Sequence, residues 1–404
     1  MSKTMIPKIR HKLFTGDWEK HILKNKATFT TGHGYSKGDL RQVGKPIILY
    51  GRLYTKYETI IRDVDTYVIE QPNSVFSKGG EIIIPSSGES AEEISVASMV
   101  DKEGIIIGGG LNIIKTSEID PAFLALLLTY GKPHYDLAKK AQGKTIVHLY
   151  NQDISQVDLV LPPTNDEQKT IANLIDKIDL LISKTEDEVS KLHDIKKAYR
   201  SMLFPRPGEK IPRVRFKGYS GEWVKKRLGN CFDERNERST QGELLSVTQS
   251  SGIKRFSEIG RHDNSNVSSG NYKVVKCGDI AYNSMRMWQG ASGWSPYEGI
   301  VSPAYTVIVP KENISSLFFS FLFKKPEIIH LFRINSQGLT SDTWNLKYPA
   351  FSPIEVLCPN SYEEQKEIAN FLFELDTLIT VCTRRLKTLK HIKQACLDGM
   401  FVNE

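Results

Sequence analysis

Several features that would mark a particular class of protein are scarce or missing in this 404-residue sequence. It has only five cysteines, none before Cys231 and no two in a C-x-x-C pair, so it favours reduced thiols over a disulfide scaffold or a zinc site. The longest apolar runs, FLALLL at 123–128 and LFFSFLF at 317–323, are far shorter than the roughly 20 residues of a membrane helix. The first residues lack the apolar core of a secretory signal. We therefore expect a cytoplasmic protein that does not enter a membrane.

The sequence also has little that matches a catalytic or metal-binding motif. Its nine histidines show no H-E-x-x-H or other paired spacing. The glycine-rich segment GGGLNIIKT at 108–116 has Ile114 where a phosphate-binding loop needs glycine. SSGES at 86–90 is not a nucleophile elbow. We expect no active site, no metal and no cofactor bound by this chain.

The composition is that of a soluble globular protein with a mild excess of basic residues. Hydrophobic residues make up 40% and charged residues 25% of the sequence. Its length suggests two or three domains. The net charge of +7 is compatible with a nucleic-acid partner but does not establish one.

The first clear pattern is a repeated segment. PKIRHKLFTGDW at 7–18 returns as PRVRFKGYSGEW at 212–223, displaced by 205 residues. The identical pairs are Pro7/Pro212, Arg10/Arg215, Lys12/Lys217, Gly16/Gly221 and Trp18/Trp223. We interpret Trp18 and Trp223 as core anchors of two related domains rather than as a binding site.

A longer repeat closes each half of the chain, since residues 162–204 match residues 359–401 at a displacement of 197. Fainter matches lie in order between the two repeats, such as KGGEI at 78–82 with KCGDI at 276–280, and QGKT at 142–145 with QGLT at 337–340. The chain is therefore two copies of one architecture whose middle parts have diverged. Identical positions of the closing repeat, numbered in the first copy, include Glu167, Gln168, Lys169, Ile171, Ala172, Asn173, Asp179, Leu181, Ile182, Leu192, Ile195, Lys196, Ala198 and Phe204.

The middle parts predict mostly β structure. Short β-branched and aromatic runs are bounded there by Gly, Pro, Ser and Asn. These runs are KPIILYGRLYTKY, EIIIP, GIIIGGG, YKVVKCGDIAY and YTVIVP. One or two helices are expected in each domain, the best candidates being 120–130 and 315–331.

A long helix is predicted after each domain. Thr164-x-x-Glu167 and Ser361-x-x-Glu364 both fit a capping box at the helix start. Apolar residues then recur with a seven-residue period, which requires a partner helix. The predicted seam comprises Ile171, Ile178, Leu192 and Tyr199 in the first helix and Ile368, Leu375, Leu389 and Met400 in the second.

These patterns together predict an α+β fold with a pseudo-two-fold internal repeat. We expect two mostly-β globular domains separated by two long antiparallel helices that form a coiled-coil spacer. The alternative is that each helix pairs with another chain. The expected ranges are 1–163 for the first domain, 164–204 for the first spacer helix, 205–360 for a linker and the second domain, and 361–404 for the second spacer helix.

The diverged middle parts hold basic, amide and hydroxyl side chains among aromatics, in predicted loops. These are the residue types that contact phosphates and base edges in DNA, although each could equally lie on a solvated loop. In the first domain the candidates are Lys37, Arg41, Gln42, Arg52, Lys56, Ser86, Ser87, Lys144 and Thr145. In the second they are Lys254, Arg255, Arg261, Ser284, Arg286, Trp288, Gln289, Arg333, Gln337, Thr340 and Trp344.

Two other functions fit parts of the pattern. Glu167 with Lys169, and Glu364 with Lys366, mimic the Glu-x-Lys of a metal-dependent nuclease. That motif normally follows a strand, whereas here it falls in a first helical turn, where capping explains the glutamate. The other alternative is a coiled-coil scaffold without DNA specificity.

The order of motifs resembles one known family. A Gly-Asp/Glu-Trp opening, a divergent β domain with a K-x-G-D/E-I strand, a Q-G-x-T loop and a helix led by E-Q-K-x-I-A-N occur twice, over essentially the whole chain. This arrangement resembles the specificity subunit of type I restriction-modification enzymes. One departure is Leu13, which stands where the second copy has Gly218.

The resemblance implies a division of labour. Each divergent domain would be a target-recognition domain that reads one half of an asymmetric, bipartite sequence in double-stranded DNA. Residues 164–204 and 361–401 would set the gap between the half-sites and dock two methyltransferase subunits, and restriction subunits would join the full complex. The resemblance places S-adenosylmethionine, ATP and Mg²⁺ on those partners and implies a non-catalytic role for this chain.

Overall fold

The computed structural model describes residues 5–143, 146–249, 252–259, 271–340 and 343–402. The chain divides into two compact units, unit 1 with Met1–Asp187 and Thr383–Glu404, and unit 2 with Glu188–Cys382. Each unit thus holds one domain, the first part of its own long helix and the last part of the other long helix. Among the described residues, no helix is long and apolar enough to cross a membrane.

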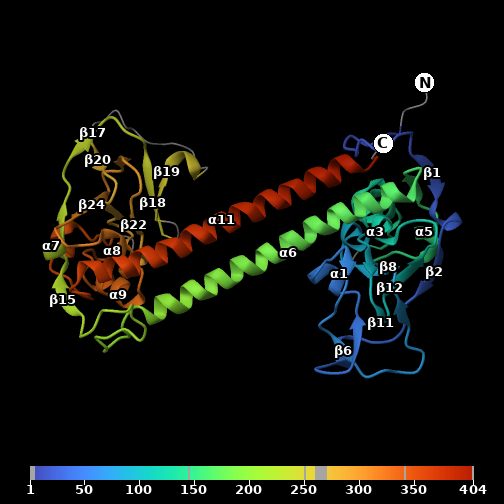
Figure 1. The fold of residues 1–404 in the computed structure, drawn as a ribbon, viewed down its shortest axis with the longest axis horizontal. Coiled ribbons are helices and arrows are strands. Elements are labelled where there is room, and N and C mark those ends of the chain that lie inside the picture. The colour runs from blue at the N-terminus through green and yellow to red at the C-terminus, as the bar shows by residue number, and fades with distance from the viewer. Residues whose placement is uncertain (1–4, 144–145, 250–251, 260–270, 341–342, 403–404) are drawn as a thin grey trace. The chain divides into compact units, whose positions relative to one another are not determined.

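Unit 1 combines two five-stranded sheets with short helices (Figure 1). One sheet has the order β2-β12-β8-β10-β5 and the other the order β3-β6-β4-β11-β7, while β1 pairs with β14 and β9 with β13. The strands are β1 (Glu19–Ile22), β2 (Thr28–Thr31), β3 (Leu40–Arg41), β4 (Lys45–Ile48), β5 (Ile60–Ile61), β6 (Tyr67–Val68), β7 (Phe76–Lys78), β8 (Glu81–Pro85), β9 (Ser87–Gly88), β10 (Ser98–Val100), β11 (Glu103–Ile107), β12 (Leu111–Lys115), β13 (Val147–His148) and β14 (Asp158–Leu161). The helices are α1 (Arg52–Thr55), α2 (Ala91–Ile94), α3 (Pro121–Tyr130), α4 (Lys132–Lys140), α5 (Asn151–Ser155) and α6 (Asn165–Met202), with 3-10 turns η1 (Leu23–Asn25) and η2 (Lys37–Asp39).

The core of unit 1 follows from the alternation of side chains along β8. Ile82 and Ile84 pack in one hydrophobic cluster with Phe123 of α3, whereas Ile83 packs in a second cluster with Ile107 of the other sheet. β8 is buried on both faces, which explains its uninterrupted run of isoleucines. α3 is apolar on all sides, and eight of its ten residues are buried.

Unit 2 repeats this plan with smaller sheets, of order β16-β24-β21-β22 and β17-β20-β23, while β15 pairs with β25 and β18 with β19. The strands are β15 (Val224–Arg227), β16 (Phe232–Glu234), β17 (Arg238–Ser239), β18 (Leu245–Thr248), β19 (Gly252–Arg255), β20 (Tyr272–Val275), β21 (Ile280–Asn283), β22 (Ser292–Trp294), β23 (Gly299–Val301), β24 (Tyr305–Pro310) and β25 (Glu355–Cys358). The helices are α7 (Leu228–Cys231), α8 (Ser316–Leu322), α9 (Pro326–Ile334), α10 (Tyr348–Phe351) and α11 (Tyr362–Met400), with 3-10 turns η3 (Phe256–Glu258) and η5 (Met287–Gln289).

The second core repeats the alternation seen in the first. Ile280 and Tyr282 of β21 pack with Phe318 of α8, while Ala281 packs with Val301 of the other sheet. The two units therefore share one architecture, and the predicted α+β fold with an internal repeat is confirmed.

The long helices pair with each other inside each unit. In unit 1, Lys393 of α11 binds Asp179 of α6 and Lys390 binds Glu186, both at 2.6 Å. In unit 2, Lys196 of α6 binds Asp376 of α11, and the rings of Tyr199 and Phe371 lie 4.9 Å apart. Residue numbers rise along one helix as they fall along the other, so the pairing is antiparallel and within this chain.

The predicted seam residues do not all pair the two helices. Some pack in the core of a domain instead, and the seven-residue period alone does not distinguish these two uses. Ile171 and Ile178 are buried in the core of unit 1, and Ile368 in the core of unit 2, so the first turns of each helix pack on their own domain. Met400 is buried in the core of unit 1, which holds the end of α11. The other seam residues are Leu375, which is buried, Leu192 and Leu389, which are half-buried, and Tyr199, which is exposed.

Two local predictions were wrong. The run KPIILYGRLYTKY was expected to be β structure, but its second half forms α1, whose Leu53 is buried in a hydrophobic cluster. The helix expected over 315–331 is broken into α8 and α9, because Pro326 cannot continue a helix and instead occupies the first turn of α9.

Candidate nucleic-acid interface

Arg10, Trp18 and Glu167 join the N-terminal segment of unit 1 to the first turn of α6. Nε and Nη2 of Arg10 donate to the two carboxylate oxygens of Glu167 at 2.7 and 2.8 Å. Nε1 of Trp18 donates to Oε1 of the same carboxylate at 3.3 Å. The Glu167 side chain is only 1% exposed. We call this group the first Arg–Glu–Trp cluster.

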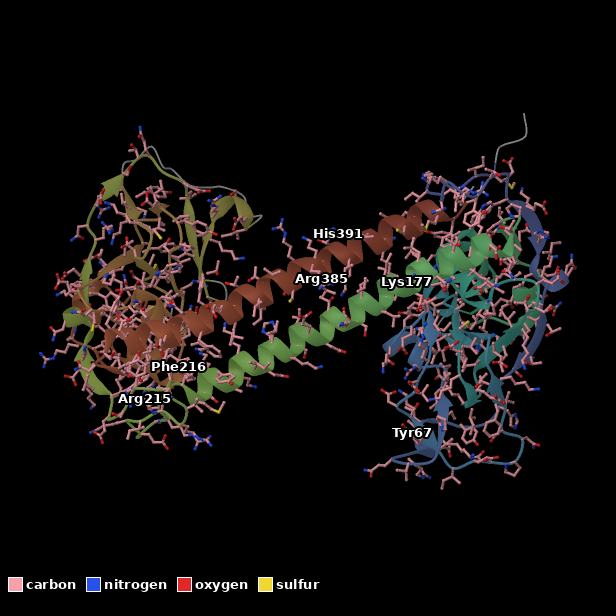
Figure 2. The ribbon with its side chains drawn as sticks, viewed as in Figure 1. Tyr67, Lys177, Arg215, Phe216, Arg385 and His391 are labelled. Carbon is pink, nitrogen blue, oxygen red and sulfur yellow. The ribbon has the colours of Figure 1, made fainter. Side chains whose placement is uncertain are left out.

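Unit 2 holds the same group with the same geometry. Arg215 donates to the Glu364 carboxylate at 2.7 and 2.8 Å, and Nε1 of Trp223 donates to it at 3.3 Å. This second Arg–Glu–Trp cluster is buried to the same degree, since the Glu364 side chain is also 1% exposed. Arg215 and the neighbouring Phe216 lie beside the end of α6, where the N–H of Val214 donates to the carbonyl of Met202 (Figure 2).

The repeated glycines complete both clusters. Nη1 of Arg10 donates to the carbonyl of Gly16 at 2.6 Å, and Nη1 of Arg215 to the carbonyl of Gly221 at 2.5 Å. Gly16 and Gly221 have φ values of +84° and +79°, which glycine adopts without strain. The repeated Arg, Gly and Trp therefore serve one structural purpose, and the prediction that Trp18 and Trp223 anchor the cores is confirmed by their 2% exposure.

The predicted capping boxes are half correct. The Glu167 N–H donates to Oγ1 of Thr164 at 3.4 Å, and the Glu364 N–H to Oγ of Ser361 at 3.3 Å. The glutamate side chains, however, bind Arg and Trp instead of the capping N–H. Because these buried carboxylates are already engaged by cations and indole N–H groups, the clusters also argue against the nuclease interpretation of Glu167 with Lys169 and Glu364 with Lys366.

The glutamine that follows each of these glutamates ties the long helix to its domain. Oε1 of Gln168 accepts from the N–H of Asp120, which caps α3, at 2.9 Å. Oε1 of Gln365 accepts in the same way from the N–H of Ser315, which caps α8, at 3.0 Å. The repeated Glu-Gln pair is thus an anchoring device rather than a reactive site.

The densest group of predicted contact residues lies in unit 2. The rings of Trp288 and Trp344 meet edge to face at 5.2 Å, and the Arg333 guanidinium lies 5.4 Å from the centre of the Trp344 ring. Nε1 of Trp288 donates to the carbonyl of Met285 at 3.1 Å. Both tryptophans are half-buried, while Arg333 is exposed. We call Trp288, Arg333 and Trp344 the Trp–Arg cluster, and it joins two sequence segments predicted to contact DNA.

The other predicted residues of unit 2 are placed less uniformly. Arg286, Lys254, Arg255, Gln337 and Thr340 are exposed, and Gln289 is half-buried. The Arg255 guanidinium already binds Glu243 at 3.2 Å and lies over the Tyr297 ring. Ser284 is wrong as a contact residue, because it is 4% exposed and its hydroxyl bonds to Thr306 at 2.8 Å.

In unit 1 the described predicted residues lie around η2 and β3 and around α1. Lys37 and Arg41 are exposed near η2, and Lys56 is exposed and binds Asp65 at 3.3 Å. Ser86 and Ser87 are half-buried beside α1, since the Tyr54 hydroxyl donates to the Ser87 carbonyl. Gln42 is exposed after β3. Lys144, Thr145 and Arg261 lie outside the described residues.

Arg52 is the second correction among the predicted contact residues. Its side chain is 8% exposed, and it binds Glu58 at 2.6 Å and Asp65 at 2.8 Å. A guanidinium buried between two carboxylates is not available to a phosphate or a base. Arg52 therefore stabilises the loop after α1.

Lys324 is a site residue that the sequence did not single out. Its ammonium donates to the carbonyls of Gln249, Gly290 and Ser292 at 3.1, 2.5 and 2.7 Å. It therefore holds the end of η5, which carries Trp288. Burial, and secondarily the nearby charge of Arg200, lowers the pKa of Lys324 from 10.5 to about 8. Its position between α8 and α9 in the sequence gives no signal of this role.

This pKa gives a pH-dependent prediction for Lys324→Met. Because the folded-state pKa of Lys324 lies below its unfolded value, the unfolded chain binds more protons between pH 8 and 10.5. The free energy of unfolding should then rise with pH there, by at most about 1.4 kcal/mol per pH unit from this group. Denaturant titrations at pH 8, 9 and 10 should show this rise in the wild type relative to Lys324→Met. Parallel pH profiles would contradict it.

Comparisons with known proteins agree with this two-unit organisation. A family model described as "Type I restriction modification DNA specificity domain" matches residues 16–191 and again residues 220–391. No curated protein matches the chain.

Three solved structures are similar to this chain, and the first of them shares its fold. The crystal structure of a type I restriction-modification S subunit from M. genitalium is 16% identical, with a TM-score of 0.66 over 99% of this chain and 100% of that one. The HsdS subunit from Thermoanaerobacter tengcongensis is 15% identical, with a TM-score of 0.41 over 96% of this chain and 97% of that one. A third structure, from work on the assembly and conformational transition of the type I R-M system, is 15% identical with a TM-score of 0.43, over 94% of this chain and 96% of that one.

Proposed function

Because the chain belongs to the family of type I restriction-modification DNA specificity domains, we propose that it selects the DNA target for such a complex without catalysing a reaction itself. Each unit reads one half of an asymmetric, bipartite sequence in double-stranded DNA. The observation that carries this proposal is a contrast between the two units. They share their fold and their Arg–Glu–Trp clusters, but they differ in the residues predicted to contact DNA. Two identical units would require a palindromic target. Here the units differ, because Val147 of unit 1 occupies the repeat position of Trp344, a member of the Trp–Arg cluster in unit 2.

We propose that two methyltransferase subunits dock on the long helices. A partner that binds both copies alike must use features that the copies share. Leu181 and its repeat counterpart Leu378 are 41% and 50% exposed, and Ile195 and its counterpart Ile392 are 42% and 46% exposed. These four apolar side chains have no role in the cores of the units, so an alternative use in partner docking accounts for them.

The remaining partners and cofactors follow from the same proposal. Restriction subunits join the full complex, and S-adenosylmethionine, ATP and Mg²⁺ bind to the partner subunits rather than to this chain. Cytoplasmic location stays a prediction from the sequence.

The proposal is tested by co-expressing the chain with a type I methyltransferase subunit from the same genome. We expect the two proteins to co-purify, and sequencing of the host DNA should show methylated adenines in one bipartite motif. A purified chain that cleaves DNA alone, with cleavage lost in Glu167→Gln with Glu364→Gln, would favour the nuclease. Partner binding without any sequence preference would favour a scaffold.

The helices are further proposed to set the gap between the half-sites. Because α6 and α11 pair with each other, one heptad should be inserted in each, after Asp187 and after Cys382. Seven residues add about 10 Å of helix, close to the length of three base pairs of DNA. The methylated motif should keep both half-sites and change only its gap. An unchanged gap would exclude this spacing role.

A further inference from the structure

The two long helices carry very different charge over equivalent residues. Residues 377–397 of α11 contain five Lys or Arg and no Asp or Glu. Residues 180–200 of α6, their counterparts at the repeat displacement of 197, contain five Lys or Arg and four Asp or Glu. The difference lies within a repeat whose other features are shared, so it calls for a separate explanation.

Two of the five cations in residues 377–397 hold the helix in unit 1. Lys390 and Lys393 bind Glu186 and Asp179 of α6. Arg384, Arg385 and Lys387 are exposed and have no ion pair or side-chain hydrogen bond among the described residues. Their charge is therefore available to a ligand.

Three basic side chains share one face of α11. Arg384, Lys387 and His391 follow the i, i+3, i+7 spacing of a single helical face, and Arg385 lies outside that face. Lys393, which binds α6, is placed on the opposite side by the same periodicity. Figure 2 labels Arg385 and His391 on this part of α11. We call Arg384, Lys387 and His391 the basic stripe.

The equivalent face of α6 is acidic rather than basic. The repeat counterparts of Arg384, Lys387 and His391 are Asp187, Ser190 and Asp194, all of them exposed. A partner that binds the two copies alike cannot use a face that is basic in one copy and acidic in the other. The basic stripe therefore fits a ligand that meets the chain once.

We propose that the basic stripe binds backbone phosphates of the DNA segment that lies between the two half-sites. This inference rests on the proposed function, which supplies a DNA segment that neither domain reads. Thr380, Thr388 and Gln394 on this face are polar, and Asp398 lies on it one heptad beyond His391, where it accepts a hydrogen bond from Gln394. Protein interfaces instead have apolar centres depleted in lysine, so the chemistry favours a polyanion.

The test compares two variants of the chain in its complex with the methyltransferase. The stripe variant combines Arg384→Gln, Lys387→Gln and His391→Gln. The control combines Lys191→Gln, Lys197→Gln and His193→Gln, which removes the same charges from exposed positions of α6. The affinity for DNA that carries the methylated motif is measured by fluorescence anisotropy at several KCl concentrations.

Each phosphate contact contributes about 0.9 to the slope of log affinity against log salt. We expect the stripe variant to lose about 2 from this slope at pH 8, for the contacts of Arg384 and Lys387. The methylated motif should stay unchanged. DNA with uncharged methylphosphonate linkages between the half-sites should lower the slope of the wild type by the same amount. It should not lower the slope of the stripe variant any further.

The possible results distinguish failure of the phosphate contact from failure of the proposed function. A wild-type slope in the stripe variant, with selective binding intact, would overturn the phosphate contact and leave the proposed function standing. Loss of methyltransferase co-purification in the stripe variant alone would assign the stripe to a protein partner and refute the inference. A wild-type complex without any sequence preference would instead refute the proposed function itself.

Discussion

Replacing Glu364 by alanine is expected to destabilise unit 2 by about 3–5 kcal/mol, because it leaves the Arg215 guanidinium buried without its counter-ion. The Arg215 side chain is only 15% exposed, so water cannot replace the lost carboxylate. The indole N–H of Trp223 loses its acceptor as well. Hydrogen exchange measured by mass spectrometry should show more than about 100-fold faster exchange in the first turns of α11.

The neighbouring glutamate provides a matched control. Glu363→Ala removes a carboxylate from the same helical turn, but that side chain is 65% exposed and binds only Lys366. It should change the free energy of unfolding by less than about 0.5 kcal/mol. Equal effects of the two substitutions would mean that the second Arg–Glu–Trp cluster does not hold the unit together.

The internal repeat supplies a second control for the same prediction. Glu167→Ala should raise exchange in unit 1, where the Arg10 side chain is 11% exposed, and leave unit 2 protected. Replacing both members of the second ion pair, as Arg215→Met with Glu364→Met, should cost less than Glu364→Ala alone, because no charge remains buried.

The helix boundaries could be predicted because the signals for them are local. The capping residues Thr164 and Ser361 and the prolines before them lie next to α6 and α11, whose bounds agree with the predicted ranges within a few residues. The partner of Glu167 could not be found in this way. Arg10 lies 157 residues away, and a capping box already explained the glutamate.

Contact residues were harder to predict because residue type says little about burial. Ser284 and Arg52 are polar residues in predicted loops, yet Ser284 is buried, the Arg52 side chain is 8% exposed, and both bond within the protein. The sequence did associate the segments around Trp288 and Trp344 with one function. Their pairing in space depends on α9, which overlaps a predicted helix, and on Lys324, which has no sequence signature.

Arg333→Ala is expected to relax recognition at one base pair of the second half-site only. Arg333 is exposed, and a bidentate contact of arginine with guanine is worth about 1–3 kcal/mol, so discrimination there should fall about 10- to 100-fold. Sequencing of methylated adenines in cells that carry the variant measures this directly. Arg227→Ala, which removes an arginine 66% exposed on β15, is the control and should leave the motif unchanged.

The Trp–Arg cluster makes a graded version of this test possible. Trp344→Phe keeps an aromatic face under the Arg333 guanidinium and an edge contact with Trp288, so it should retain most of the discrimination. Trp344→Leu keeps apolar bulk but removes the ring, so Arg333 is no longer held and the motif should relax at the same base pair as in Arg333→Ala. A relaxation in both half-sites would contradict two independent readers, and equal behaviour of the phenylalanine and leucine variants would show that the ring does not position the arginine.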